Sequence, residues 1–248
     1  MRTFGIIGFP LSHSFSKKYF DDKFLKENIP DSEFRVFEME NVLGIKDFIA
    51  NHPNLYGLSV TIPHKEIILN YLDEIDEDAK NIGAVNCIKV SQKDNKPFLS
   101  GFNTDTYGFE NSLRPLLKPH HQKALILGTG GAAKAVAFTL DKLGIDYLFI
   151  TRKPTGCKHI RYSILHEGIL NDHSLIINTT PLGMFPNIDS FPDIPYQFIS
   201  DKHLLFDLTY NPEETLFQKK GKEKRASIKN GLKMLHLQAD RAYGIWKG

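Results

Sequence analysis

Residues 123–135 read KALILGTGGAAKA, and this stretch decides the fold class. The apolar run Lys123–Leu127 has the composition of a buried strand, and Ala132–Leu143 has that of a helix. Between them lie the glycines of the loop, Gly128, Gly130 and Gly131. A strand, a glycine turn and a helix bring backbone N–H groups and the positive end of the helix to one point, where a dinucleotide pyrophosphate binds. The loop departs from GxGxxG and also fits a plain tight turn, but its flanking strand and helix favour nucleotide binding.

Further strands and helices are predicted on either side of this motif. Strands are expected at Tyr147–Ile150, Leu175–Asn178 and Leu204–Asp207, and helices at Thr106–Leu117 and Met234–Trp246. Alternation of this kind is typical of a parallel sheet covered by helices. The sequence therefore predicts a second α/β unit that begins near Asp105.

The strand after the glycine motif ends at Thr151, Arg152 and Lys153, 23–25 residues past Gly128. An NAD-specific site carries Asp or Glu here to bind the ribose 2′-hydroxyl, and no acidic residue stands at this point. Arg152 and Lys153 would instead attract a 2′-phosphate. Exposed basic residues are common at strand ends, but this position favours NADP over NAD.

The first hundred residues also alternate between strand and helix patterns. The strands are expected at Phe4–Ile7, Glu33–Glu38 and Leu55–Ile62, and the helices at Lys17–Asn28, at Asn41–Ala50 and from His64 onward. Ile88–Leu99 is typical of an antiparallel hairpin with a polar turn. The predicted fold class is therefore α/β with two domains, the first having a mixed, mainly parallel sheet.

Polar residues gather near the ends of the first-domain strands. Ser12 and Ser14 follow the first strand, where two hydroxyls can point the same way and hold a carboxylate or hydroxyls. Thr61 stands at a strand tip, and Lys65 at the predicted start of a helix, a position suited to acid–base chemistry. A polar turn and a solvated lysine are the simpler interpretations of these two groups.

Asn86, Asn103 and Asp105 end this first region. Asp105 occupies the N-cap position of the helix that follows, which is its simpler interpretation. A carboxylate beside Lys65 would also keep that amine charged. Their separation of 40 residues does not by itself bring the two groups together.

Composition excludes several classes of protein. The 248 residues include 31 basic and 29 acidic side chains, and the dense basic run Lys219–Arg225 is expected to be a solvated surface segment, so no nucleic-acid partner is predicted. Cys87 and Cys157 have no metal-ligand spacing with histidine, so neither a metal nor a disulfide framework is expected. No signal peptide and no apolar stretch of about 18 residues is found, which predicts a cytoplasmic protein without a membrane partner.

Seven motifs occur in one order along the whole chain. They read FGIIGFPLSHSFSKKYF, GLSVTIPHK, IGAVNC, GFNTDTYGF, LGTGGAAKA, INTTPLGM (Ile177–Met184) and GLKMLHLQA (Gly231–Ala239). Each is weak alone, but together they resemble the shikimate dehydrogenase family nearly end to end.

The resemblance implies two α/β domains with a cleft between them. Residues 1–104 and 231–248 would form the substrate-binding and catalytic domain, and residues 105–230 the NADP-binding domain, which would be of the Rossmann type. The activity implied is the reversible NADPH-dependent reduction of 3-dehydroshikimate to shikimate, a step toward chorismate and the aromatic amino acids. The partner implied is this small-molecule substrate, and the chain is expected to be a monomer or a homodimer.

The resemblance also implies the roles of individual residues. Lys65 and Asp105 would be catalytic. The substrate would be held by Ser12, Ser14, Thr61, Lys65, Asn86, Asp105 and Gln238. The cofactor NADP(H) would be held by Gly128, Gly130, Gly131, Ala132, Thr151, Arg152, Lys153, Thr180, Leu208, Gly231 and Met234.

The chain departs from the family pattern at the second nucleotide-domain strand. The family usually has Asn-Arg-Thr where this chain has Thr151, Arg152 and Lys153, so only the arginine matches. A quinate/shikimate dehydrogenase that uses NAD is one alternative, and a non-catalytic ligand-sensing protein of the same fold is another. The basic residues argue against the first alternative, and the presence of both Lys65 and Asp105 argues against the second.

Overall fold

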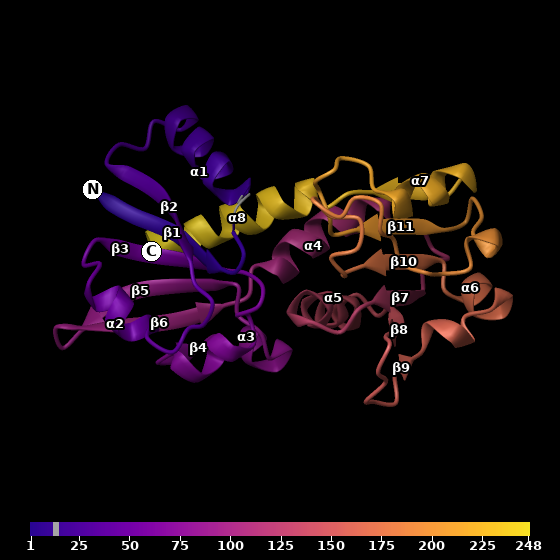
Figure 1. The fold of residues 1–248 in the computed structure, drawn as a ribbon, viewed down its shortest axis with the longest axis horizontal. Helices are drawn as coiled ribbons and strands as arrows, with labels where there is room; N and C mark the ends of the chain where they lie inside the picture. Colours follow the sequence, from indigo (N-terminus) through magenta and orange to yellow (C-terminus); the bar gives the residue numbers. More distant parts are fainter. Residues whose placement is uncertain (12–14) are drawn as a thin grey trace. The chain divides into compact units, whose positions relative to one another are not determined.

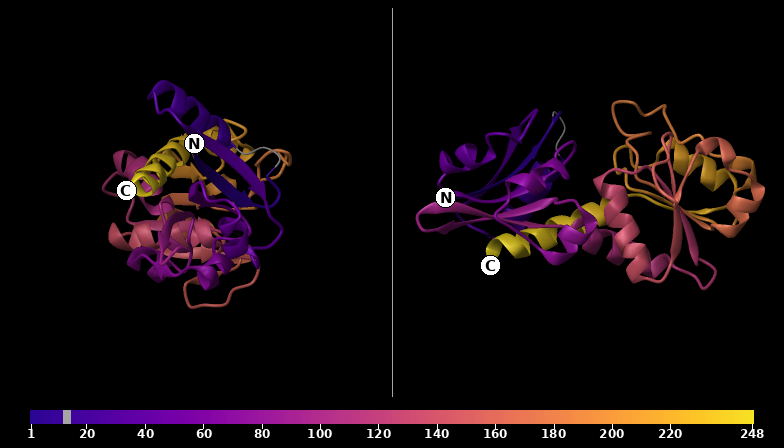
Figure 2. Two further views of the ribbon diagram at one scale, coloured as in Figure 1. Left: turned by 90° about the vertical axis from the view of Figure 1, so that its left-hand side faces the viewer. Right: turned by 90° about the horizontal axis from the view of Figure 1, so that it is seen from below.

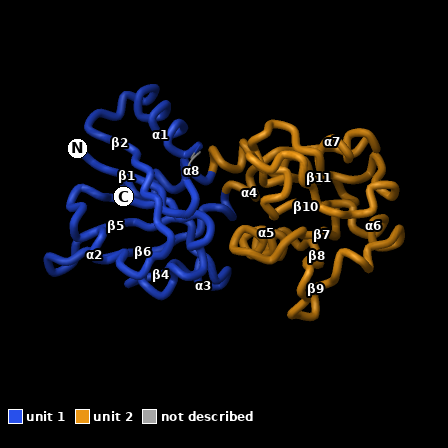
Figure 3. Tube along the Cα trace, in the orientation of Figure 1, with its two compact units in different colours: residues 1–107, 238–248 blue, residues 108–237 orange. Residues whose placement is uncertain are grey.

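The chain folds into two compact units (Figure 3). The structure, a computed structural model, describes residues 1–11 and 15–248. Unit 1 comprises Met1–Tyr107 and Gln238–Gly248, and unit 2 comprises Gly108–Leu237. The chain passes between the units inside two helices, α4 (Asp105–Leu113) and α8 (Leu232–Lys247). The boundaries expected after residues 104 and 230 lie a few residues earlier, because each of these helices carries residues of both units.

Unit 1 is built on a six-stranded mixed sheet with the order β2-β1-β3-β5-β6-β4 (Figure 1). Its strands are β1 (Arg2–Gly8), β2 (Ser32–Glu38), β3 (Leu55–Val60), β4 (Glu74–Ile75), β5 (Cys87–Lys93) and β6 (Lys96–Phe102). The pairs β1–β2, β1–β3 and β4–β6 are parallel, whereas β5 is antiparallel to both β3 and β6. The amino end of β5 therefore lies at the same edge as the carboxyl ends of β1, β3 and β6.

The hairpin expected at Ile88–Leu99 is confirmed as β5 and β6. Its turn residues, Asp94 and Asn95, have φ values of 52° and 58°. Two successive positive φ angles match the right-handed twist of a tight hairpin, and Asp and Asn tolerate them better than most residues.

Helices cover both faces of the unit 1 sheet. On one face, α1 (Phe15–Lys26) and α8 lie beside one another (Figure 2), where Phe20 of α1 and Tyr243 and Trp246 of α8 pack on Phe4 of β1. On the other face lie α2 (Ile45–Ala50), the 3₁₀ helix η1 (Ile67–Tyr71) and α3 (Glu77–Ile82). The C-terminal helix is thus part of the core of unit 1.

Unit 2 contains an entirely parallel six-stranded sheet with the order β12-β11-β10-β7-β8-β9. Its strands are β7 (Lys123–Leu127), β8 (Asp146–Ile150), β9 (His159–Ile160), β10 (Leu175–Asn178), β11 (Leu204–Asp207) and β12 (Ser227–Lys229). The first strand of the unit lies in the middle, and the chain builds outward first to one side and then to the other. This is the strand order of the Rossmann fold, which confirms the predicted fold class.

Alternate side chains of β7 enter two different cores. Ala124 and Ile126 pack with α4 and α5 (Gly131–Lys142), while Leu125 and Leu127 pack with α6 (Glu167–Asp172) and α7 (Leu216–Glu223). A strand that is buried on both faces has a continuous apolar sequence, as β7 has in KALIL. Short 3₁₀ helices complete the unit: η2 (Arg114–Leu116), η3 (Tyr162–Ile164) and η4 (Tyr196–Phe198).

Two expectations about helices differ from the structure. The helix expected at Asn41–Ala50 begins only at Ile45, and the segment from His64 forms turns followed by the 3₁₀ helix η1 instead of an α-helix. The basic run Lys219–Arg225 is mostly exposed, as expected, and it is helical as far as Glu223. Among the described residues, no helix combines the length and apolar character needed to cross a bilayer.

Candidate active site

Several predicted substrate-site residues meet at one edge of the unit 1 sheet. Thr61 follows the carboxyl end of β3, Asn86 precedes the reversed strand β5, and Asp105 follows β6 as the first residue of α4. Because β5 runs against its neighbours, all three positions lie at the same edge of the sheet. The topology therefore assembles residues from three separate segments of the chain.

Lys65 and Asp105 form a close ion pair. The Lys65 Nζ lies 2.6 Å from the Asp105 Oδ2, and the two side chains are only 17% and 8% exposed. The carbonyl of Lys65 accepts a hydrogen bond of 2.8 Å from the Val85 N–H, which fixes the lysine backbone beside the segment that leads into β5. The amine and the carboxylate, 40 residues apart in the sequence, thus meet within unit 1.

The expectation that Lys65 stands at the start of an α-helix is wrong. Lys65 lies in a turn, and the 3₁₀ helix that follows begins at Ile67. The Ile68 N–H closes this turn by donating to the His64 carbonyl at 3.0 Å. The carboxylate of Asp105, and not a helix dipole, is therefore the electrostatic partner of this lysine.

Asp105 does not serve as the N-cap of α4. The Asn103 Oδ1 accepts hydrogen bonds from the backbone N–H groups of Asp105 at 3.1 Å and Thr106 at 3.4 Å, as a capping side chain does. The Asn103 amide also donates to the Ala84 carbonyl at 2.9 Å. With the cap supplied by Asn103, the Asp105 carboxylate is available to Lys65, and it lies at the positive end of α4.

Asn86 connects Asp105 to the C-terminal helix. Its Nδ2 lies 2.9 Å from the Asp105 Oδ1 and 3.3 Å from the Gln238 Oε1 on α8. Asn86 is 3% exposed, so its amide needs hydrogen-bond partners within the protein. The structure thus brings Gln238 to the predicted site residues of the N-terminal part of the chain.

Thr104 is a contact residue that the sequence analysis did not identify. Its hydroxyl lies 3.0 Å from the Asn86 Nδ2 and 3.3 Å from the Gln238 Oε1, and it is 1% exposed. Its place between Asn103 and Asp105 in the GFNTDTYGF motif was the available signal. Ser12 and Ser14 lie outside the described residues. Among residues 1–11 and 15–248, no group of three or more His, Cys, Asp or Glu side chains is arranged to hold a metal ion.

The glycine loop of unit 2 has the geometry of a dinucleotide site. Gly128 has a φ of 112°, and a Cβ there would lie 2.7 Å from the Thr179 Oγ1, so both conformation and space require glycine. Helix α5 begins at Gly131, and its N-cap, Gly130, offers no side-chain cap. A Cβ on Gly130 would meet no atom within 4 Å. The loop therefore leaves the space beside Gly130 and the first N–H groups of α5, of which Ala132 is the second residue, open to a pyrophosphate.

The basic residues lie where the sequence predicts them. Thr151 follows the carboxyl end of β8 and donates from its N–H to the Ile160 carbonyl at 2.9 Å. The Thr151 hydroxyl accepts from the Lys153 N–H at 3.3 Å, which closes the turn. Arg152 and Lys153 are exposed at this point, beside the strand that precedes the glycine loop in the sheet. Their cationic side chains fit a 2′-phosphate.

A buried polar pair supports Thr180 and was not predicted. Both the N–H and the hydroxyl of Thr180 donate to the Asn178 Oδ1, at 3.1 and 2.6 Å, and the Asn178 amide donates to the Asp207 Oδ1 at 3.0 Å. Burial raises the pKa of Asp207 from 3.8 to about 6, against the opposing hydrogen bonds led by that from Thr215. The available signal was that Asn178 and Asp207 are the polar last residues of two apolar strands, and they are paired in register.

The last three predicted cofactor residues lie beyond β11. A Cβ on Gly231 would lie 2.0 Å from the Leu208 carbonyl oxygen, so only glycine allows this approach. Met234 is 7% exposed and belongs to the core cluster that Leu208 packs against. The structure therefore brings Leu208, Gly231 and Met234 together, with Met234 largely in the core.

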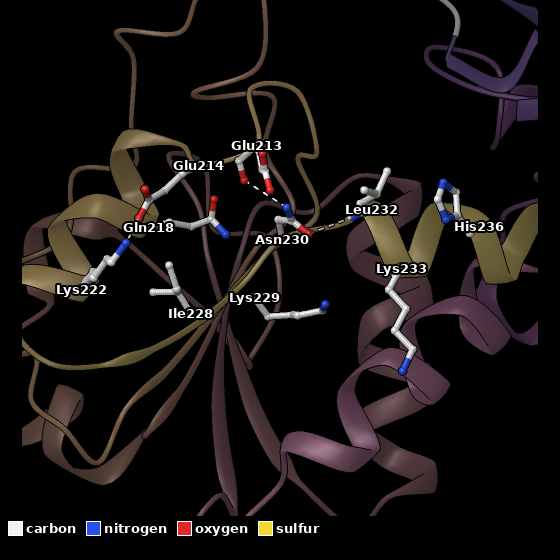
Figure 4. A pocket seen from close by; sticks show the side chains of 10 residues that line it. All are labelled: Glu213, Glu214, Gln218, Lys222, Ile228, Lys229, Asn230, Leu232, Lys233 and His236. Carbon is white, nitrogen blue, oxygen red and sulfur yellow. Dashed lines mark hydrogen bonds and ion pairs between the residues drawn. The ribbon is translucent and has the colours of Figure 1, made fainter. Parts of the chain in front are cut away.

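A concave pocket of about 640 Å³ also lies in unit 2 (Figure 4). It is lined by residues of α7, β12 and the start of α8, among them Lys229 and Lys233. None of the predicted cofactor residues lines it, although Asn230 and Leu232, which do, flank Gly231. The pocket is therefore separate from the glycine loop.

Comparison with known proteins gives consistent matches. Residues 6–88 match the family model described as the shikimate dehydrogenase substrate binding domain. The chain is 38% identical to the shikimate dehydrogenase (NADP(+)) of Clostridium beijerinckii and 35% identical to that of Caldanaerobacter subterraneus subsp. tengcongensis; both alignments cover 100% of this chain and 92% of the relative.

Solved structures agree with these relatives. A shikimate 5-dehydrogenase of Thermus thermophilus, in complex with NADP(H) and shikimate, superposes with a TM-score of 0.86 at 27% identity, over 100% of this chain and 94% of that one. A shikimate dehydrogenase in complex with NADP⁺ superposes with a TM-score of 0.85 at 34% identity, over 100% and 90%. On this fold, these motifs and this identity over the full length, the chain belongs to the shikimate dehydrogenase family.

Proposed function

We propose that this protein catalyses the reversible NADPH-dependent reduction of 3-dehydroshikimate to shikimate, on the route to chorismate and the aromatic amino acids. The observation that carries the proposal is the nearly buried ion pair between Lys65 and Asp105. An ammonium and a carboxylate held 2.6 Å apart can share a proton and can stabilise charge on a reacting oxygen. The full-length similarity to NADP-dependent shikimate dehydrogenases supports the choice of substrate and cofactor.

We assign substrate binding to unit 1. Asn86, Asp105, Thr61 and Gln238 would bind the ring hydroxyls and the carboxylate, together with the serines Ser12 and Ser14. Several hydrogen bonds to substrate hydroxyls would let the site reject analogues that lack one of them. The four described residues belong to segments that the sheet edge and α8 bring together, which supports this assignment.

Lys65 is the residue we assign to the carbonyl oxygen of 3-dehydroshikimate. As hydride adds to the carbonyl carbon, negative charge develops on this oxygen, and the Lys65 ammonium stabilises it and delivers a proton from Nζ. The Asp105 Oδ2 holds the Lys65 ammonium in place before the proton moves. In the reverse direction, Lys65 and Asp105 would accept the proton of the substrate hydroxyl.

We assign NADP(H) to unit 2. The cofactor supplies or accepts the hydride when it is bound. The glycine loop of Gly128, Gly130 and Gly131 would hold its pyrophosphate at the N-terminus of α5, and Arg152 and Lys153 would hold its 2′-phosphate. Thr180, Leu208 and Gly231 would complete the site at the ends of β10 and β11. The open space at Gly130 and the absence of a side-chain cap on α5 support this placement.

The test is the change in nicotinamide absorbance when the purified protein is mixed with shikimate and NADP⁺. We expect rapid reduction of NADP⁺ with shikimate, slower reduction of NAD⁺, and little reaction with quinate. Preference for quinate with NAD⁺ would replace the proposal by its nearest alternative. Binding of shikimate without turnover would instead indicate a ligand-sensing protein.

We also propose a cytoplasmic location and a monomeric or homodimeric state. Both cysteines, the buried Cys87 and the exposed Cys157, are free, as a reducing compartment would keep them. Fractionation of the source cells and analytical ultracentrifugation of the purified protein test these two points.

A further inference from the structure

The imidazole of His64, the residue before Lys65, links the ends of two strands that are not neighbours in the sheet of unit 1. His64 is 1% exposed, and its Nε2 lies 2.6 Å from the carbonyl oxygen of Met39. A carbonyl oxygen can only accept a hydrogen bond, so the Nε2 carries the hydrogen and donates it. His64 lies beyond the end of β3 and Met39 directly beyond the end of β2, and β1 lies between these strands (Figure 1). The side-chain bond therefore connects two strand ends that a third strand separates.

The Met39 end of this bond is held firmly. The Met39 N–H donates to the Gly8 carbonyl at 2.9 Å, which ties the end of β2 to the end of β1. The Met39 side chain packs against the buried cluster that contains Ile7 and Val60. The carbonyl that accepts from His64 therefore belongs to a fixed part of the sheet edge.

The His64 end of the bond lies in the turn that carries Lys65. The Ile68 N–H closes this turn by donating to the His64 carbonyl at 3.0 Å, and the Lys65 carbonyl accepts from the Val85 N–H at 2.8 Å. The turn is thus tied to Val85 through Lys65 and to Met39 through His64. With both ties in place, the backbone that presents the Lys65 ammonium has little freedom to move.

We infer that His64 is a positioning residue: it ties the turn to the end of β2 and so sets where the Lys65 ammonium meets Asp105. Lys65 contacts Asp105 at 2.6 Å from a segment 40 residues away, so the place of its backbone decides whether the contact forms. A misplacement of about 1 Å at a reacting group can cost on the order of 10²-fold in rate. This inference deepens the proposed function and rests on it for the role of Lys65 in the reaction.

His64→Phe is the direct test, because phenylalanine keeps a buried aromatic ring and removes the donor. We expect kcat for shikimate oxidation to fall roughly tenfold, as for the loss of one buried hydrogen bond, while KM for NADP⁺ stays within about twofold. His64→Gln carries a side-chain NH₂ group that can donate to the Met39 carbonyl, and it should recover most of the lost kcat. An unchanged kcat in His64→Phe, or equal losses in both variants, would overturn the inference.

His52→Phe is the matched control within unit 1. The His52 Nδ1 lies 2.7 Å from the Phe48 carbonyl, so this bond also joins a ring to a backbone oxygen, but it spans only four residues. We expect kcat and both KM values to stay close to those of the wild type. A loss of kcat equal to that in His64→Phe would indicate general loosening of unit 1 and would contradict a specific role for His64.

Hydrogen exchange at the Val85 amide tests the tie without turnover. This N–H donates to the Lys65 carbonyl, so its exchange rate reports on how firmly the Lys65 backbone is held. We expect roughly tenfold faster exchange in His64→Phe than in the wild type, and near-wild-type exchange in His64→Gln and His52→Phe, measured by NMR on labelled protein. Val85 protection that is unchanged in His64→Phe would show that His64 does not fix the turn. Absence of turnover in the wild type would contradict the proposed function instead.

A double-mutant cycle shows whether the effect passes through Lys65. His64→Phe should lower kcat much less in the Lys65→Ala background than in the wild type, because the group that it positions is already missing. Additive losses would contradict the route through Lys65.

Discussion

The Lys65 ammonium and the Asp105 carboxylate are in contact at 2.6 Å, although the two residues belong to different segments of the chain. Lys65 lies in the turns between β3 and η1, and Asp105 is the first residue of α4. Each is anchored by its own backbone: Lys65 through its carbonyl to Val85, and Asp105 through its N–H to Asn103. The Asp105 carboxylate is further held by the Asn86 amide at its second oxygen. The pair is thus built into the fold and is not a chance contact of two mobile surface side chains.

The first prediction concerns Lys65→Ala. Removal of the ammonium takes away both the proton donor and the charge that stabilises the reacting oxygen, so we expect kcat to fall by roughly 10²–10⁴-fold. KM for shikimate should change much less, because the other polar residues of the site remain. Steady-state kinetics with saturating NADP⁺ measure both constants.

Lys80→Ala is the matched control for this variant. Lys80 is an exposed lysine of the same unit, on α3, and its removal should leave kcat and KM unchanged. Near-wild-type turnover of Lys65→Ala would show that the role assigned to Lys65 is wrong.

The second prediction concerns cofactor choice at Arg152. Loss of a charge-assisted contact to the 2′-phosphate of NADP should raise KM for NADPH by roughly tenfold or more in Arg152→Ala. KM for NADH should not change, because NADH lacks this phosphate. Steady-state kinetics with each cofactor give the ratio of KM for NADPH to KM for NADH. Arg161→Ala, which removes an exposed arginine of unit 2, is the control. An unaltered NADPH/NADH ratio would exclude the contact.

The sequence predicted the glycine loop well because its geometry depends on neighbours along the chain. The strand before it, Lys123–Leu127, is observed with those same bounds, and the helix begins one residue before the expected start at Ala132. The apolar strand Lys123–Leu127 is buried on both faces of the sheet, which produces a strong local sequence signal. Local patterns of this kind are what allow the fold class to be predicted from the sequence.

The sequence could not predict contacts that depend on strand direction. The meeting of Lys65 with Asp105 requires a reversed β5, and the hairpin pattern alone does not tell which neighbour β5 pairs with. The same limit applies to Asn178 and Asp207, which pair across parallel strands that are 29 residues apart. Strands of two or three residues, such as β4, β9 and β12, are too short to show a period.

The third prediction concerns the pH dependence of stability at Asp207. Its pKa is about 6 in the folded protein and close to 3.8 when unfolded, so the folded state binds the proton more tightly. The stabilising contribution is complete below pH 3.8 and is lost as the pH rises through about 6, a change on the order of 3 kcal/mol. Urea unfolding monitored between pH 4 and 7 measures it.

Asp207→Asn should remove this dependence. The asparagine oxygen can accept from the Thr209 N–H and the Asn178 amide, and its NH₂ group can meet the Thr215 hydroxyl. His121 titrates with the opposite sign, because burial lowers its pKa from 6.5 and acid therefore destabilises the fold. The quantity to compare is therefore the difference in the free energy of unfolding between Asp207→Asn and the wild type at each pH. A difference that does not change with pH would contradict the assignment to Asp207.

The fourth prediction concerns Gly57, on which the indole of Trp246 rests. A Cβ at residue 57 would lie 2.3 Å from the indole Cγ, and Trp246 is 3% exposed, so the ring has nowhere to retreat. Gly57→Ala should therefore destabilise the protein by about 1–3 kcal/mol, as overpacking of a core does. Because Trp246 is the single tryptophan of the chain, its fluorescence reports directly on the displaced helix.

The effect of Gly57→Ala should also reach the substrate site. Trp246 and Gln238 lie on the same helix, α8, so displacement of the ring shifts the amide that contacts Asn86. We expect KM for shikimate to rise together with the change in fluorescence, while KM for NADP⁺ stays constant. Gly44→Ala is the control, since a Cβ there meets no atom within 4 Å. If Gly57→Ala alters the fluorescence but leaves KM for shikimate unchanged, then the packing of Trp246 stabilises the fold without setting the position of Gln238.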